Sequence, residues 1–188
     1  MTNQLNGCSV AILVTDGFEQ VEMTEPRKAL EQAGAQTQIV SPKNGQVQGW
    51  NHQNKGDVFK VDVALDSADP KSFDALLLPG GVANPDQLRM IPKAVVFVAS
   101  FVRDAKPIAA ICHGPWMLVE AKAVTRKTLT SWPSIKTDIL NAGGNWVDRE
   151  VIVDGNLVTS RKPDDIPAFN KQMIAVFAES VKHAPAAR

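Results

Sequence analysis

Apolar residues gather in short runs along the chain, separated by polar turns. Cys8–Thr15 is continuously apolar and β-branched between Gly7 and Asp16-Gly17, which is typical of a strand buried on both faces. Val58–Leu65 instead alternates apolar with polar positions, which predicts a half-exposed strand near an edge. Further strands are predicted at Gln36–Val40, Phe73–Leu78, Ile108–Ile111 and, as a hairpin with an Asp-Gly turn, Val151–Thr159.

Segments of helical composition alternate with these runs. The first spans about Val21–Ala33, where Gly34 ends it and Pro26 is tolerated only in the first turn. Other helices are predicted at Asp86–Asp104, Trp116–Ala123, Pro133–Ala142 and Asp164–Lys182, while Pro42–Gly56 is polar and turn-rich. Such alternation indicates an α/β fold in which a mostly parallel sheet has helices on both faces. We expect one domain over residues 1–188, with a frayed tail at His183–Arg188.

Charge and composition narrow the function classes. The 188 residues include 20 Lys and Arg against 20 Asp and Glu, and no basic stripe is present, so nucleic acid is not an expected partner. No apolar run approaches the ~20 residues of a membrane span, and Met1–Gly7 lacks a signal pattern. We therefore expect a cytoplasmic protein without a membrane partner. The spacing of Cys and His and the absence of a Gly-rich phosphate loop predict neither metal nor cofactor.

Unusual residues follow four of the predicted strands. They are Asp16–Glu19, Pro79–Gly81, Cys112–Pro115 and Ser131–Pro133. Ligands of an open parallel sheet bind at the carboxyl ends of the strands, so these groups are expected to border one crevice. Cys112 lies between a buried strand and a helix, the position of a nucleophile elbow.

Several neighbours have the chemistry to assist this thiol. The helix dipole and nearby donors are expected to lower the pKa of Cys112. The Gly80 and Gly81 amides, with the His113 N–H, are candidate oxyanion donors. His113 is the candidate base and Asp86 a candidate to orient it, although Asp86 also suits a helix N-cap.

The motifs together resemble the ThiJ/PfpI family, closest to its PfpI branch. They are Asp16-Gly17-Phe18-Glu19, Leu78-Pro79-Gly80-Gly81, Ala110-Ile111-Cys112-His113-Gly114-Pro115 and Asn141-Ala142-Gly143-Gly144-Asn145-Trp146-Val147-Asp148. The resemblance implies a flavodoxin-like three-layer sandwich that forms a homodimer or larger homo-oligomer. It also implies that Cys112 is the nucleophile, His113 its triad neighbour, Glu19 a protonated carboxyl under the thiol and Asp86 an acid contributed across the subunit interface.

Two classes of function follow from this resemblance. The first is a stress-protective enzyme whose Cys112 attacks a carbonyl carbon, as a PfpI-type peptidase or amidase, or as a glyoxalase or deglycase acting on methylglyoxal adducts. The substrate would be a peptide, a small carbonyl compound or a glycated amine, and a pocket narrowed by the bulky Trp116 favours the small aldehyde. The alternative is a redox sensor or holdase chaperone that signals through oxidation of Cys112. Cys8 is expected to be inert packing, and His52 to be solvated.

Overall fold

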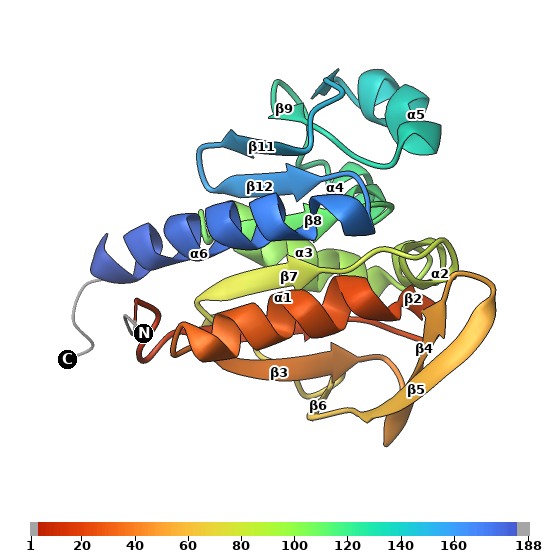
Figure 1. Ribbon diagram of the computed structural model, residues 1–188, viewed down its shortest axis with the longest axis vertical. Coiled ribbons are helices and arrows are strands. Elements are labelled where there is room, and N and C mark those ends of the chain that lie inside the picture. The colour runs from red at the N-terminus through yellow and green to blue at the C-terminus, as the bar shows by residue number, and fades with distance from the viewer. Residues whose placement is uncertain (1–3, 184–188) are drawn as a thin grey trace.

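The computed structural model describes residues 4–183 (Figure 1). Of the predicted tail, His183 is instead the last residue of a helix, and residues 184–188 lie outside the described part. The strands are β1 (Ser9–Leu13), β2 (Phe18–Glu19), β3 (Gln36–Ser41), β4 (Gln46–Asn51), β5 (Asn54–Lys60), β6 (Val63–Ala64), β7 (Ala75–Leu78), β8 (Ile108–Ile111), β9 (Thr128–Leu129), β10 (Asn145–Trp146), β11 (Val151–Asp154) and β12 (Leu157–Ser160). The α-helices are α1 (Gln20–Gln32), α2 (Ala83–Arg89), α3 (Pro92–Arg103), α4 (Pro115–Glu120), α5 (Lys136–Asn141) and α6 (Ile166–His183), and short 3-10 helices form at Pro70–Ser72, Pro133–Ile135 and Pro163–Asp165.

Within these residues, one seven-stranded sheet runs through the molecule in the order β11-β12-β8-β7-β1-β3-β6. Every neighbouring pair is parallel except the β11–β12 hairpin at one edge. The predicted α/β fold with a mostly parallel sheet is therefore confirmed. Two small sheets lie beside it, one pairing β9 with β10 and the other joining β2, β4 and β5.

Helices cover both faces of the main sheet. Helices α1 and α6 lie in front of it in Figure 1, and α3 and α4 lie behind it. Alternate residues of β1 belong to the two cores, because successive side chains of a strand point to opposite faces. Val10 and Ile12 pack on the α1 and α6 side, and Ala11 and Leu13 on the other. None of the helices within residues 4–183 has the length and apolarity to cross a membrane.

The single helix predicted over Asp86–Asp104 is wrong, because α2 and α3 are separate helices. Ile91 between them is extended, with φ −102° and ψ 105°. Pro92 explains the break, since a proline disfavours helical backbone at the residue before it and then fits the first turn of the next helix. Asp86 is not an N-cap either, because α2 begins earlier, with Val82 at that position.

The segment Pro42–Gly56 contains regular structure, although its polar, turn-rich composition predicted none. Strands β4 and β5 form an antiparallel hairpin, which Figure 1 shows at the lower right. The predicted edge strand Val58–Leu65 is accordingly divided between the end of β5 and the short edge strand β6. The hairpin matters for the site because β4 pairs with β2, directly before α1.

Helix α1 begins at Gln20, which places Pro26 beyond the first turn, contrary to expectation. A proline there has no N–H to donate to the carbonyl four residues earlier, which is that of Glu22. The ring is buried, on the same helix face as Glu22 and Leu30. Packing of this face against the core thus outweighs the lost backbone hydrogen bond.

Candidate active site

Cys112 lies at a sharp bend between β8 and α4. Its φ is +61°, in the left-handed region that side chains other than glycine rarely adopt. Backbone hydrogen bonds hold the bend on both sides: the Cys112 N–H donates to Ser160 O at 3.0 Å, and its carbonyl accepts from Trp132 N–H at 2.9 Å. This is the strained strand-to-helix turn expected of a nucleophile elbow.

Cys112 borders a cavity of about 600 Å³. Gly17 and Glu19 reach it after β1, Gly81 after β7, Cys112 and His113 after β8, and Trp132 after β9, so the four sequence groups do meet. The β4–β5 hairpin adds Trp50, His52 and Gln53 to the wall. Cavities of roughly 300–1,000 Å³ suit small organic ligands.

The carboxyl group beside the thiol belongs to Glu22, not to Glu19 as predicted. Glu22 is fully buried in the first turn of α1. A side-chain hydrogen bond links it to Cys112, and its Oε2 accepts from the Gly80 N–H at 3.0 Å. The prediction for Glu19 was wrong because the rotation of α1 against the sheet decides which acid points inward. It turns Glu22, three residues after Glu19, toward the thiol.

Burial raises the pKa of Glu22 to about 8, and the nearby negative charge of Glu19 adds to this effect. Glu22 is therefore protonated at neutral pH. Its Oε1 is buried and has no hydrogen-bond partner among residues 4–183. Burial also raises the pKa of the Cys112 thiol, contrary to the expected lowering, and a charge on Glu22 would raise it further. The resting sulfur is thus a neutral thiol that needs a base.

His113 is in position to act as that base. Its Nδ1 lies 3.2 Å from Cys112 Sγ, and its Nε2 lies 3.1 Å from Ser134 Oγ. The ring packs between two indoles, with centroids 5.5 Å from Trp116 and 5.9 Å from Trp132. This burial lowers the pKa of His113 to about 4, so the ring is neutral. A proton on Nε2 donated to Ser134 leaves Nδ1 free to accept the thiol proton.

The candidate oxyanion donors divide into two groups. The backbone N–H groups of Gly81 and His113 interact with the Cys112 sulfur, and the Gly81 N–H interacts with the Glu22 carboxyl as well. The Gly80 N–H is bound to Glu22, so the proposed role of Gly80 as an oxyanion donor is not supported. Its lack of a side chain is nevertheless required, since a Cβ at Gly80 would lie 2.6 Å from the Cys112 Cβ.

The two other predicted acids, Glu19 and Asp86, form no hydrogen bond to Cys112 within the described residues. Glu19 lines the cavity and accepts a hydrogen bond from the His52 N–H at 3.0 Å. Asp86 is exposed on α2 and lines no part of the cavity, and no hydrogen bond within the described residues joins it to His113.

Trp116 does not narrow the pocket, contrary to expectation. Its indole N–H donates to Asp138 at 2.8 Å and the Arg89 guanidinium lies 5.4 Å from its ring, away from the cavity lining. Trp132, from the predicted group Ser131–Pro133, lines the cavity.

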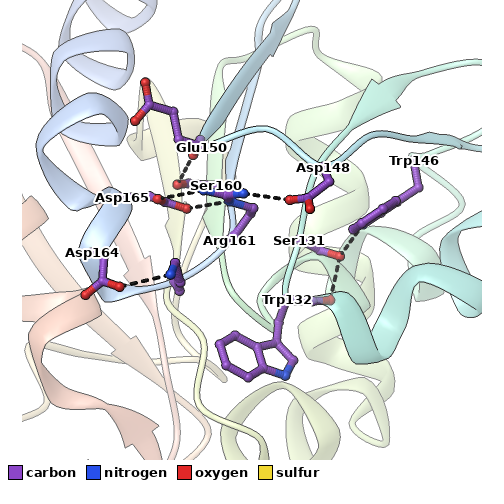
Figure 2. A network of polar contacts seen from close by, with 10 residues as sticks. Ser131, Trp132, Trp146, Asp148, Glu150, Ser160, Arg161, Asp164 and Asp165 are labelled. Atoms are coloured by element: carbon purple, nitrogen blue, oxygen red, sulfur yellow. Dashed lines mark hydrogen bonds and ion pairs between the residues drawn. The ribbon is translucent and has the colours of Figure 1, made fainter.

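A polar network behind Trp132 supports this side of the cavity (Figure 2). Arg161 donates to Asp165 at 2.8 Å and to Asp148 at 2.6 Å. The Ser131 hydroxyl accepts from the Trp146 indole at 3.0 Å and donates to the Trp132 carbonyl at 2.9 Å. Figure 2 shows the Trp132 ring pointing away from this network, so the backbone is fixed while the indole remains available to the cavity.

Comparisons with known proteins place the chain among relatives. Residues 8–176 match the model of the DJ-1/PfpI family. The chain belongs to the DJ-1/PfpI family. One relative, General stress protein 18 of Bacillus subtilis, is 44% identical over 90% of this chain and 98% of its own length. "Putative cysteine protease YraA" of Bacillus subtilis is 42% identical over 88% of this chain and 95% of its own length. "Deglycase TK1284" of Thermococcus kodakarensis is 40% identical over 88% of this chain and 96% of its own length.

Solved structures of the DJ-1/PfpI family share the fold. A two-domain protein of Anabaena variabilis with a DJ-1/ThiJ/PfpI-like domain matches with a TM-score of 0.83 at 33% identity, over 89% of this chain and 47% of that one. DJ-1beta of Drosophila melanogaster matches with a TM-score of 0.80 at 24% identity over the whole of both chains. The second likeness supports the fold alone.

Two members of the site were missed from the sequence. Glu22 carried a usable signal, because Glu22, Pro26 and Leu30 recur every four residues on one face of α1, and an acid in that apolar stripe must be buried. Ser134 carried no such signal, since an exposed serine in a 3-10 turn is ordinary. Within the described residues, no group of three or more His, Cys, Asp or Glu side chains is placed to hold a metal ion.

Proposed function

We propose that this protein is a stress-protective, cysteine-dependent enzyme of the glyoxalase or deglycase type, with Cys112 attacking the carbonyl carbon of an aldehyde or its early adduct on an amine. The observation that carries the proposal is the chain of contacts from Cys112 Sγ through His113 to Ser134, beside protonated Glu22 and open to a cavity. Relatives named as a stress protein, a cysteine protease and deglycases support this class.

The first chemical step follows from these contacts. As Sγ forms a bond to the carbonyl carbon, His113 Nδ1 takes the thiol proton, and Ser134 Oγ accepts the hydrogen bond that keeps Nε2 protonated. The Gly81 and His113 N–H groups lie near the sulfur and stabilise the negative charge that develops on the carbonyl oxygen. Because Glu22 is protonated, its carboxyl adds no negative charge directly beside the sulfur during this step.

The strength of the base favours an aldehyde over an amide. An imidazole whose pKa is lowered to about 4 is a weak base, and the Ser134 hydroxyl stabilises an imidazolium less than a carboxylate would. Aldehydes are strongly electrophilic and need little activation of the thiol, whereas amide hydrolysis must also expel an amine. We therefore place peptidase activity second.

The test is a side-by-side assay of the wild type, Cys112→Ser and Ser134→Ala. Substrates are methylglyoxal, methylglyoxal-treated N-acetylarginine and casein. We expect wild-type turnover of the first two, none in Cys112→Ser, and a kcat about tenfold lower in Ser134→Ala, as for one lost hydrogen bond at the reacting centre. Casein hydrolysis faster than methylglyoxal consumption would reverse the assignment.

A redox-sensing role for Cys112 is the competing function. Oxidation by peroxide proceeds through the thiolate, and burial raises the thiol pKa, so slow oxidation is expected. Intact-mass spectra after mild peroxide measure this directly. Rapid addition of oxygen to Cys112, together with undetectable turnover of every carbonyl substrate, would favour the sensor.

We also propose that the protein works in the cytoplasm as a homo-oligomer in which the partner's Asp86 reaches the site. The exposed position of Asp86 on α2 supports this. Asp86→Asn is expected to lower turnover while light scattering shows the same mass as for the wild type. Unchanged turnover would exclude the residue from the reaction.

A further inference from the structure

The side chains nearest the sulfur carry no charge near neutral pH. Burial keeps Glu22 protonated up to pH about 8 and His113 neutral down to pH about 4, and the buried Cys112 is a thiol. Among residues 4–183, no lysine or arginine lines the cavity. Glu19 is then the carboxylate of this cavity, and the His52 imidazole is the other titratable group beside it.

Few protein groups offset the negative charge of the Glu19 side chain. Its side chain is only 12% exposed, yet Oε2 accepts one hydrogen bond, from the His52 N–H at 3.0 Å. The His52 ring is 85% exposed, with Nδ1 3.8 Å from the same oxygen, and no other hydrogen bond within the described residues reaches the carboxylate. A carboxylate shielded from solvent with one N–H donor is stabilised by any cation that enters.

Two indoles complete the surroundings. Trp50 is the strand partner of Glu19 across β4 and β2, and Trp132 forms another part of the wall. Trp132 stacks on His113 with one face, but 38% of the residue remains exposed, and both indoles line the cavity. Indole faces attract cations, and a quaternary ammonium among aromatic rings is a common case. An anion would instead face Glu19 without a counter-ion.

We propose that Glu19, Trp50 and Trp132 form a subsite for a positively charged group, so that the enzyme prefers carbonyl substrates bearing an ammonium or guanidinium group over neutral or anionic ones. The inference rests on the proposed function for its reaction centre, since Cys112 must be the atom that meets the carbonyl. It adds the class of substrate, namely carbonyl compounds or adducts that retain a cationic group.

The first experiment measures the charge preference at Cys112 without turnover. The full-length protein reacts at pH 7 with methanethiosulfonates carrying either a trimethylammonium-ethyl or a sulfonatoethyl group, and peptide mapping separates Cys112 from the buried Cys8. The ratio of the cationic to the anionic rate is divided by the same ratio for 2-mercaptoethanol. We expect this corrected ratio to be at least about fivefold for the wild type and close to one for Glu19→Gln. Glu25→Gln, which removes an exposed acid of α1, should keep the wild-type ratio. A wild-type ratio near one, or one that survives Glu19→Gln, overturns the subsite.

The second experiment separates the subsite from the reaction. Acetonyltrimethylammonium and 4,4-dimethylpentan-2-one have the same shape and differ in charge, and each is tested for protection of Cys112 against iodoacetamide. We expect the cation to protect at a concentration about fivefold lower. Equal protection overturns the subsite and leaves the carbonyl chemistry intact. Protection by neither, with a preserved charge preference in the first experiment, overturns the carbonyl chemistry instead and leaves the subsite.

Discussion

Replacing Glu22 by glutamine should change how stability depends on pH. The folded protein keeps the Glu22 proton up to pH about 8, while the unfolded chain releases it near pH 4.5. Between these values the native state binds one more proton than the unfolded state, so the free energy of unfolding falls as pH rises, and it levels off above pH about 8. Glutamine has almost the same shape and no proton to release. The variant should therefore lose this part of the pH dependence.

The expected size follows from the displacement of the pKa. A rise from 4.5 to about 8 corresponds to about 5 kcal/mol over the full range, or about 1.4 kcal/mol for each pH unit. The free energy of unfolding of Glu22→Gln should thus rise relative to that of the wild type by roughly this amount as pH increases. This holds whatever the difference in stability between the two proteins is at low pH. Partial opening of the cavity to water would reduce the figure without changing its sign.

Urea denaturation at several pH values from about 5 to about 8 measures this difference. Other titrating groups cancel between the two proteins, and Glu25→Gln controls for removal of an exposed charge. The extrapolated free energies are reproducible to roughly 10–15%, which is sufficient for an effect of several kcal/mol. A stability difference that stays constant across the range, or that changes with the opposite sign, would show that Glu22 is ionised in the folded protein.

Two further predictions concern the supports of the site. Arg161→Leu should destabilise the protein by about 3–5 kcal/mol, because it leaves Asp165, whose side chain is 6% exposed, without its ion pair. Arg103→Leu removes an exposed ion pair and should cost far less. Thermal denaturation compares the two variants, and equal losses of stability would contradict the reasoning. Gly114→Ala should abolish alkylation of the Cys112 thiol or prevent folding, because a Cβ at this position would lie 2.4 Å from the Leu78 carbonyl oxygen. Circular dichroism and alkylation kinetics measure these two effects. A folded variant with wild-type kinetics would show that the elbow tolerates a side chain.

The sequence by itself determined the parts of this protein that depend on neighbouring residues. Buried strands such as β1 appear as continuous apolar runs, and the strand followed by Cys112-His113-Gly114 specifies an elbow because only a residue without a side chain fits two positions after the nucleophile. The meeting of the groups after β1, β7 and β8 also followed from the sequence, since the carboxyl ends of parallel strands in one sheet share an edge. Trp132 reaches the same cavity from β9, which belongs to a separate small sheet, so its place there was decided by the tertiary structure.

Only the tertiary structure decided which side chains touch the sulfur and with what electrostatics. The choice of Glu22 over Glu19 depends on how α1 is rotated against the sheet, and the role of Ser134 depends on where a 3-10 turn meets His113. The thiol pKa was expected to fall, on the basis of the helix dipole, but rises because burial outweighs it, and burial is a property of the whole packed cavity. Local patterns specify elements and turns, whereas contacts between distant segments and the solvent they exclude exist only once the chain is folded.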